Sequence, residues 1–279
     1  MSLLKNMLNS AFSPARKPSS AASPSAPAGA QREPAQGARA PVRHVWQLLD
    51  DETGVQDFDY PDNPRPEIRG LLRQPPRRVL DIGCATGAVG LGLKQAYPGT
   101  WVWGCELNPR AAQIARTRLD HVTTVPREQW PASDQALLGE VDTVLLLDVL
   151  EHMYNPWAEL RHLSETLAAG AQVIVSLPNA GHLNVMAGLA AGTFRYEPAG
   201  ILDITHIRFF TLQEMRRMFE ETGFAIEAET IISTSQGPQV SEFPLYMSSG
   251  KLTLKVDSLQ EWQVLNAVQI GFRLAARRS

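Results

Sequence analysis

The sequence contains little cysteine and no long apolar run. Its two cysteines, Cys84 and Cys105, are too few for a disulfide framework and lack the spacing of a zinc or redox site. Each ends an apolar segment, so we expect both to be reduced thiols packed in the interior. No stretch approaches the roughly 18 apolar residues that a membrane-spanning helix needs. These absences predict a soluble protein of a reducing, cytoplasmic compartment.

Basic charge is scarce over most of the chain. The net charge is -3, although residues 1–43 hold six lysines and arginines against the single acid Glu33. The remainder is therefore more acidic than the chain as a whole. An acidic body attracts nucleic acid poorly, which argues against a nucleic-acid partner.

The N-terminal part has almost no large apolar side chains. Residues 13–40 consist mainly of Ala, Ser and Pro, so they cannot bury enough surface to offset chain entropy. We predict a disordered basic arm over 1–40 and one globular domain over 41–279. Residues 2–12 can form a short amphipathic helix, for peripheral membrane contact or partner docking; the alternative is a frayed terminus. The apolar face of that helix would hold Leu3, Leu4, Met7, Leu8 and Phe12.

An apolar strand followed by a turn of small residues is the most informative motif. Residues 78–87 read RVLDIGCATG. Gly83, Ala85 and Gly87 leave the backbone open to a ligand at the carboxyl end of the strand, and Asp81 adds a charge beneath the turn. The spacing D-x-G-x-x-x-G differs from the G-x-G-x-x-G of dinucleotide sites. We interpret it as the turn that seats a nucleotide-like cofactor.

An acid ends the next apolar segment. Residues 100–107 read TWVWGCEL and place Glu106 near the end of a second strand. In a doubly wound sheet, an acid there lies where a ribose diol binds. The turn and the acid together are more specific than either alone.

On these motifs the chain resembles the class I S-adenosylmethionine-dependent methyltransferases, over about residues 41–278. In that family the turn holds the methionine part of the cofactor and the acid binds both ribose hydroxyls. Residues 142–156, DTVLLLDVLEHMYNP, resemble the ubiquinone-pathway O-methyltransferase branch. SLPNAGHLN and LDITHIRFFT are similar to segments of bacterial relatives in saccharide and cell-surface biosynthesis. The cofactor residues implied by the resemblance are Asp81, Gly83, Cys84, Ala85, Gly87, Glu106, Leu107 and Asp148.

Helices and strands alternate after residue 41, which predicts an α/β fold with a parallel sheet covered on both faces. Helix starts are marked at Asn108, Asn155 and Thr211, and we expect the last two helices to stop at Gly170 and Gly223. Seven apolar segments can form strands. The resemblance implies a Rossmann-like, doubly wound seven-stranded sheet with the last strand antiparallel. The predicted strands cover 77–84, 100–107, 121–125, 141–148, 171–178, 224–232 and 266–276.

Three of the six histidines follow predicted strands or a predicted lid. His152 and His182 lie at the carboxyl edge of the sheet, and His206 follows the lid-like residues 180–200. His152 or His206 is a candidate general base, since an unperturbed imidazole has a pKa of about 6.5. We expect structural or solvated roles for the other three, His44, His121 and His162.

A divalent metal is the second hypothesis for this edge. Asp148, Glu151 and His152 follow a D-x-x-E-H spacing that resembles the metal-binding E-x-x-E-H of small-RNA 2′-O-methyltransferases and of some ubiquinone-pathway enzymes. His182 would complete the set. A third alternative is that the histidines are purely structural.

Two segments of the sequence are not explained by the family resemblance. After the third strand, the sequence offers Glu128 or Asp134 to the adenine amino group, and neither is assigned. Residues 233–262 form a long link rich in Ser and Gln. We expect it to pack over the sheet, to cap the substrate site or to pair with a second subunit; the sequence leaves the oligomeric state open.

These observations predict methyl transfer to oxygen on a small molecule or saccharide precursor. Alternatives are nitrogen or carbon methylation, a protein side chain as acceptor, and a non-catalytic cofactor-binding domain. Lid residues favour a polar or anionic acceptor, because guanidinium groups pair with phosphate and carboxylate; salt bridges within the lid are the other interpretation. These lid residues are Phe194, Arg195, Tyr196 and Arg208.

Overall fold

The computed structural model describes residues 45, 49, 62–235 and 240–277, all within one compact unit, Val45–Ser279. The predicted arm over 1–40, with its helix over 2–12, lies outside the described residues. Within the described part of the chain, no helix combines the length and apolar character needed to cross a membrane.

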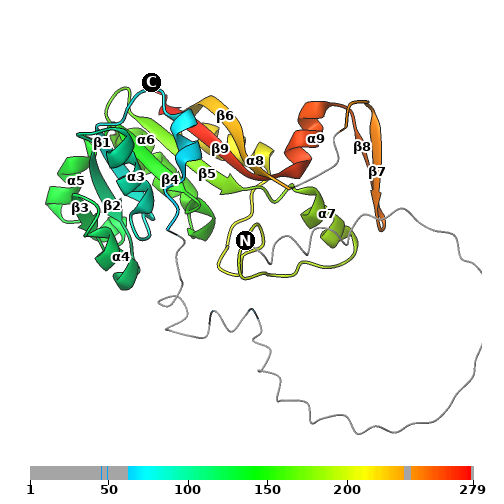
Figure 1. The fold of residues 1–279 in the computed structure, drawn as a ribbon, viewed down its shortest axis with the longest axis horizontal. Coiled ribbons are helices and arrows are strands. Elements are labelled where there is room, and N and C mark those ends of the chain that lie inside the picture. The colour runs from blue at the N-terminus through cyan, green and yellow to red at the C-terminus, as the bar shows by residue number, and fades with distance from the viewer. Residues whose placement is uncertain (1–44, 46–48, 50–61, 236–239, 278–279) are drawn as a thin grey trace, which may run out of the picture. The chain divides into compact units, whose positions relative to one another are not determined.

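A seven-stranded sheet forms the centre of the unit, with the strand order β3-β2-β1-β4-β5-β9-β6 (Figure 1). β1 to β5 are parallel, and β9 is antiparallel to both β5 and β6. The predicted doubly wound sheet with an antiparallel last strand is therefore confirmed. The strands are β1 (Arg78–Ile82), β2 (Trp101–Cys105), β3 (His121–Thr123), β4 (Thr143–Leu147), β5 (Gln172–Pro178), β6 (Phe224–Thr234) and β9 (Ala267–Ala276).

Helix starts coincide with the predicted capping residues. The side-chain oxygens of Asn108, Asn155 and Thr211 accept backbone N–H bonds at the first turns of α4, α6 and α8. α6 ends at Thr166, earlier than predicted, and Gly170 (φ 81°) lies in the turn that leads to β5. The helices are α3 (Ala88–Ala96), α4 (Pro109–Ala115), α5 (Ala132–Leu138), α6 (Pro156–Thr166), α7 (Leu183–Ala190), α8 (Leu212–Glu221) and α9 (Leu259–Asn266); short 3-10 turns are η1 (Pro66–Leu71), η2 (Arg127–Gln129) and η3 (Leu150–His152).

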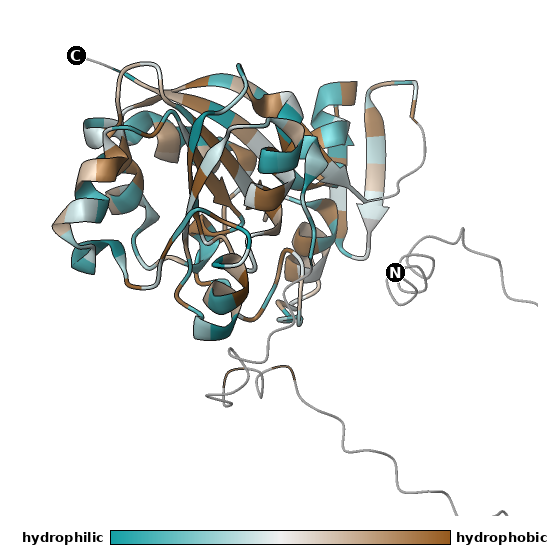
Figure 2. Cartoon of the chain, turned by 60° about the vertical axis from the view of Figure 1, so that its left-hand side comes forward, coloured by the Kyte–Doolittle hydropathy of each residue, from teal (hydrophilic) through white to brown (hydrophobic). Residues whose placement is uncertain are grey.

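Each face of the sheet packs against its own apolar layer. Alternate residues of β1 separate accordingly: Val79 packs with η1 and α3, whereas Leu80 packs with α5, α6 and α8. Because both faces are covered, the central strands are mainly apolar, as the brown colour at the centre of Figure 2 shows. This arrangement leaves the carboxyl ends of the strands as the edge where loops gather.

Residues 240–262 contain more secondary structure than expected for the predicted long link. They contain the hairpin of β7 (Leu245–Ser249) and β8 (Leu252–Val256), followed by α9. The hairpin lies near α7, at the end of the molecule opposite β3 (Figure 1). Val256 and Trp262 are buried, so the hairpin and α9 are packed onto the unit.

Candidate functional site

The turn between β1 and α3 has an unusual backbone. Gly83 (φ 73°), Ala85 (φ 48°) and Gly87 (φ 75°) all have left-handed conformations, which bring N–H groups and carbonyls to the carboxyl edge of the sheet. A Cβ on Gly83 would lie 2.8 Å from Cγ2 of Val149. Glycine at this position is therefore required both by φ and by the close approach of the loop after β4.

Glu106 is held in place by that turn. Its side chain is buried; Oε2 accepts from the Ala85 N–H at 2.9 Å, and Oε1 accepts from the Asn108 N–H at 2.7 Å. Each carboxylate oxygen keeps lone-pair capacity for a further donor. A fixed carboxylate with two free acceptor positions fits a ribose diol, and the neighbouring Leu107, 62% exposed, offers an apolar surface beside it.

Asp81 lies beneath the turn and is almost fully buried. Burial, and next the nearby Glu106, raise the pKa of Asp81, Arg65 partly opposes them, and the net result is a pKa of about 7. Oδ2 of Asp81 has no hydrogen-bond partner among the described residues. Burial also raises the pKa of the Cys84 and Cys105 thiols, so the prediction of packed, reduced cysteines is confirmed.

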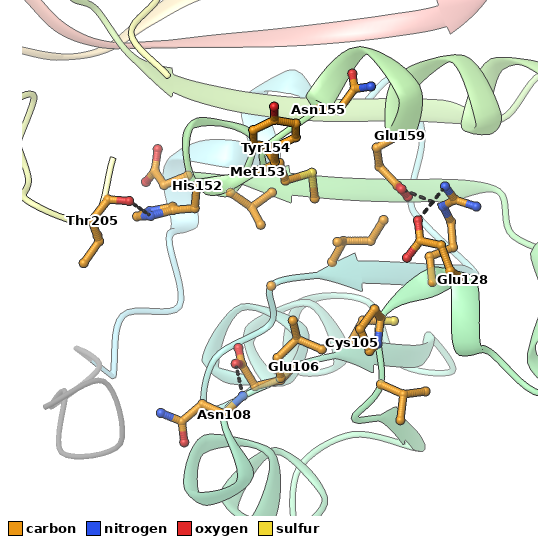
Figure 3. A pocket seen from close by; sticks show the side chains of 18 of the residues that line it. Cys105, Glu106, Asn108, Glu128, His152, Met153, Tyr154, Asn155, Glu159 and Thr205 are labelled. Carbon is orange, nitrogen blue, oxygen red and sulfur yellow. Dashed lines mark hydrogen bonds and ion pairs between the residues drawn. The ribbon is translucent and has the colours of Figure 1, made fainter. Parts of the chain in front are cut away.

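A cavity of about 1100 Å³ opens over these residues. Figure 3 shows His152 and Thr205 at one end, Glu128 and Glu159 at the other, and Glu106 between them. Of the predicted cofactor residues, four line the cavity: Gly83, Glu106, Leu107 and Asp148. The other four lie in or below the turn: Asp81, Cys84, Ala85 and Gly87.

At the end opposite His152, the two acids that follow β3 differ in position. Arg127 donates to Glu159 at 2.6 Å and to Glu128 at 3.1 Å, and all three line the cavity. Asp134 instead lies buried on α5, where it accepts from Thr123 and lies 3.1 Å from His121 Nε2. Asp134 is thus occupied by structural bonds, and Glu128 is the acid of that pair that faces the cavity.

Two histidine rings meet at the other end. Nδ1 of His152 lies 3.2 Å from the Thr205 carbonyl, and Nδ1 of His206 lies 3.0 Å from the Ile201 carbonyl. Since a carbonyl only accepts, each Nδ1 carries the proton in a neutral ring and each Nε2 keeps its lone pair. The ring centroids are 4.8 Å apart. Desolvation, and next the proximity of His206, lower the pKa of His152, which favours the neutral form.

Glu151 adjoins this pair and is the clearest unpartnered group of the site. It is 1% exposed, and neither carboxyl oxygen has a hydrogen bond among the described residues; Oε1 lies 3.9 Å from His206 Nε2. Burial, and next the charge of Asp148, raise the pKa of Glu151 well above its usual value. One donor atom each from Glu151, His152 and His206 lie within 4.8 Å of one another, a set that can hold a divalent cation.

The cluster therefore differs from the predicted metal ligands at two residues, Asp148 and His182, which are not part of it. Asp148 is bonded to Arg65, Ser176 and Gln269. His182 caps α7, where Nδ1 accepts from the Asn184 N–H and Nε2 lies 3.0 Å from Ser235 Oγ. His206 takes the place that the sequence offered to His182, because the loop before α8 returns to η3: Ile207 and Arg208 donate backbone bonds to the Glu151 carbonyl.

The lid residues form an aromatic group beside His206. The rings of Phe194, Tyr196 and Phe209 pack at 5.2 to 6.3 Å between centroids, and Phe209 lies 6.3 Å from His206. Arg208 donates to the carbonyl of Tyr154 and lies over its ring, so this guanidinium is engaged within the protein. His121 and His162 are not among the residues that line the cavity, and His44 is outside the described residues.

Comparison with known proteins agrees with this geometry. Residues 60–229 match a methyltransferase-domain family. The ubiquinone biosynthesis O-methyltransferase of Thiobacillus denitrificans is 26% identical over 61% of this chain and 72% of its own length. That of Aeromonas salmonicida is 28% identical over 54% and 63%.

Solved structures support the fold. An S-adenosylmethionine-dependent methyltransferase from Archaeoglobus fulgidus aligns with a TM-score of 0.51 at 16% identity, over 76% of this chain and 92% of that protein. At this level of identity the likeness shows a shared fold. The chain belongs to the class I S-adenosylmethionine-dependent methyltransferases.

Proposed function

We propose that this methyltransferase transfers its methyl group to a hydroxyl oxygen of a small molecule or saccharide precursor, with His152 as the general base. The observation that carries the proposal is the position of His152 in the wall of the same cavity as Glu106 and Gly83. Its Nδ1 is engaged by the Thr205 carbonyl, which leaves Nε2 free to accept a proton. The relatives named O-methyltransferases support oxygen as the methylated atom.

Cofactor binding is divided among the residues around the turn. The Gly83–Gly87 backbone and the underlying Asp81 hold the methionine part, Glu106 accepts from the ribose hydroxyls, and Leu107 contacts the base. Glu128 is the acid available to the adenine amino group. When bound, S-adenosylmethionine supplies a methyl group activated by a sulfonium, so the protein contributes mainly alignment and proton removal.

Proton removal would proceed at the His152 end of the cavity. Nε2 of His152 accepts the proton of the acceptor hydroxyl, and the ring becomes positively charged. His206 and Glu151 adjoin His152: the ring centroid of His206 is 4.8 Å from that of His152, and the Glu151 carboxyl group belongs to the same cluster. We assign His206 to catalysis as a positioning residue, through this ring contact with His152.

A divalent cation is the second candidate at this place. Glu151, His152 and His206 present one carboxyl oxygen and two unprotonated Nε2 atoms, while a backbone carbonyl orients each imidazole from the other side. Carbonyl-oriented histidines with a carboxylate are a common ligand set for Mn²⁺, Fe²⁺ or Zn²⁺. Such an ion would lower the pKa of an acceptor hydroxyl.

The two mechanisms can be separated by one set of assays. Release of S-adenosylhomocysteine is measured with a panel of catechols, phenols and hydroxylated saccharides, for the parent, His152→Gln, His206→Gln and Glu151→Gln. A general base predicts a loss of about 100- to 10,000-fold in kcat for His152→Gln, unchanged S-adenosylhomocysteine affinity and no response to chelator.

The metal mechanism predicts that chelation abolishes turnover, that Mn²⁺ or Mg²⁺ restores it, and that Glu151→Gln is as damaging as His152→Gln. His162→Gln is the matched control, because His162 lies outside the cavity. If chelator and all three site variants leave kcat within about threefold of the parent, far below the general-base range, both mechanisms are refuted. Methylation of amines but of no hydroxyl in an extended panel would refute the O-methyltransferase assignment itself.

A further inference from the structure

Asp203 lies in the loop between the lid and α8, in the wall of the cavity. It is 8% exposed, and it lines the cavity together with His152 and Thr205. Asp203 forms an isolated β-bridge with Glu197 and belongs to no helix or strand. The backbone around Asp203 is therefore ordered by local hydrogen bonds.

These local bonds centre on Asp203. Its Oδ1 accepts from the Thr205 N–H at 2.8 Å and from Thr205 Oγ1 at 2.6 Å. An aspartate that accepts from the N–H two residues on forms an Asx-turn. The backbone carbonyl of Asp203 also accepts from the His206 N–H at 3.0 Å, which closes a β-turn over residues 203–206. Three hydrogen bonds accepted by Asp203 thus fix Thr205 and the backbone of His206.

The peptide unit between Thr205 and His206 connects this turn to His152. Its N–H is held by Asp203, and its carbonyl lies 3.2 Å from Nδ1 of His152 (Figure 3). Because a trans peptide unit is planar, its N–H and C=O point in opposite directions, so a fixed N–H also fixes the direction of the carbonyl. The carbonyl in turn requires a proton on Nδ1 and leaves Nε2 with a lone pair.

His206 is attached to the same turn. Its backbone N–H is one of the donors to Asp203, and its ring centroid is 4.8 Å from that of His152. Loss of the turn therefore affects both imidazoles. His152 loses the fixed partner of its ring, and His206 loses a bond of its own backbone.

We propose that Asp203 is a positioning residue for methyl transfer: its turn holds the Thr205 carbonyl against Nδ1–H of His152, which keeps the lone pair on Nε2 for the acceptor proton. The proposal rests on the proposed role of His152 and goes beyond it, since it names what selects the active tautomer. With the proton on Nε2, the ring would present an N–H where the base needs a lone pair. Asp203 acts here as a hydrogen-bond acceptor, so an amide oxygen at Oδ1 can replace it.

The first test is the tautomer of His152, which needs no acceptor. Imidazole nitrogen chemical shifts are recorded for the S-adenosylhomocysteine complex with chelator present, at a pH where the rings are neutral, and His152 is assigned with His152→Gln. The parent is expected to carry the proton on Nδ1. Asp203→Ala removes both side-chain bonds and is expected to shift His152 toward the Nε2–H form, whereas Asp203→Asn should retain the parent form. An unchanged tautomer in Asp203→Ala, or Nε2–H in the parent, would overturn the proposal.

Turnover measures the consequence. Asp203→Ala is expected to lower kcat about 10- to 100-fold, because a displacement of about 1 Å in a reacting group can cost that much. Affinity for S-adenosylhomocysteine should stay within about twofold, since no hydrogen bond to the cofactor is lost. Asp203→Asn should keep kcat within about threefold of the parent, because Oδ1 still accepts both bonds. Equal losses of kcat in Asp203→Asn and Asp203→Ala would show that the charge matters rather than the turn, and the positioning role would be wrong.

A double variant separates positioning from general support of the fold. If Asp203 acts through His152, Asp203→Ala/His152→Gln has the kcat of His152→Gln alone, because residues that act as a unit are not additive. A further loss as large as that of Asp203→Ala alone would overturn the proposal. If Asp203→Ala unfolds in thermal melts, Thr205→Val replaces it: this variant loses the Oγ1 bond, and an unchanged His152 tautomer there would have the same consequence.

Asp120→Ala is the matched control. Oδ2 of Asp120 also accepts a backbone N–H, from Val102 at 2.8 Å, and Asp120 is not among the residues that line the cavity. It should leave kcat and the tautomer of His152 unchanged; a control as damaging as Asp203→Ala would reduce Asp203 to support of the fold.

Failure of this proposal differs from failure of the proposed function. If His152→Gln leaves kcat unchanged, the general-base role is wrong whatever the tautomer. If His152→Gln lowers kcat while Asp203→Ala changes neither kcat nor the tautomer, the base role stands and the positioning role of Asp203 is wrong.

Discussion

At the scale of single residues, Asp81 predicts a pH-dependent stability of the cofactor-free protein. Its pKa is raised to about 7 by burial and next by Glu106, so the folded state keeps a proton that the unfolded chain releases near pH 4. Between these pH values the folded state binds more protons, and the free energy of unfolding therefore falls as pH rises, by up to about 4 kcal/mol. Above about pH 7 this contribution levels off.

Asp81→Asn keeps the shape and removes the titration. Its free energy of unfolding in urea, measured from pH 5 to 8, is expected to lose this decline, and the variant should exceed the parent most at pH 8. Asp142→Asn, at a partly buried turn before β4 where Asp142 accepts from Arg77 N–H, is the control. Parallel curves for the parent and Asp81→Asn would show that Asp81 is ionised in the folded protein at all these pH values.

The sequence predicted those site residues that follow directly after a strand. Gly83, Glu106 and His152 follow three neighbouring strands, so the parallel sheet brings them to one edge. The choice between His182 and His206 depended on where a long loop returns, and spacing carries no such information. Arg65, which binds Asp148, was missed for the same reason: its other partner Gln269 lies at the other end of the chain.

At the scale of elements, the β1–α3 turn predicts a measurable cost for a single methyl group. Gly83→Ala places a Cβ 2.8 Å from Val149 Cγ2 at φ 73°, so it combines a clash with a strained backbone. We expect a loss of about 1 to 3 kcal/mol in the free energy of unfolding and weaker S-adenosylhomocysteine binding.

The double variant Gly83→Ala/Val149→Ala separates the two causes, since it removes the clash and keeps the strain. It should recover part of the affinity for S-adenosylhomocysteine. Gly99→Ala is the control: it also has a positive φ (93°) but open space around the position. If Gly99→Ala is as damaging to S-adenosylhomocysteine binding as Gly83→Ala, the close approach of the β1 and β4 loops is not what the turn requires.

Helices and strands were predicted correctly where the sequence has an apolar pattern and a residue that marks the end of the element. The seven strands are apolar runs, and α4, α6 and α8 begin at the capping residues Asn108, Asn155 and Thr211. The hairpin β7–β8 has neither a strong apolar run nor a flanking cap. Gly250, at φ 57°, begins the two-residue Gly250-Lys251 turn and is the signal that could have revealed the hairpin.

At the scale of the whole molecule, we predict that catalysis does not require the N-terminal arm. The cavity lining described by the structure extends from Ile82 to Thr205, well after the predicted arm. Removal of residues 1–40 should therefore leave kcat and S-adenosylhomocysteine affinity within about twofold of the parent values. The loss of even one hydrogen bond to the cofactor would change the affinity by more than that.

The same truncation tests membrane contact. The arm combines five apolar residues at helical spacing with an excess of basic charge, and each base near an anionic surface contributes about 1 kcal/mol to binding. Co-sedimentation with phosphatidylserine vesicles should therefore fall on truncation and, for the full chain, fall with added salt. The variant Leu4→Ser/Leu8→Ser, which keeps every charge, distinguishes helix insertion from simple electrostatic attraction. If vesicle binding is the same before and after truncation, the arm makes no membrane contact and the acidic body accounts for whatever binding remains.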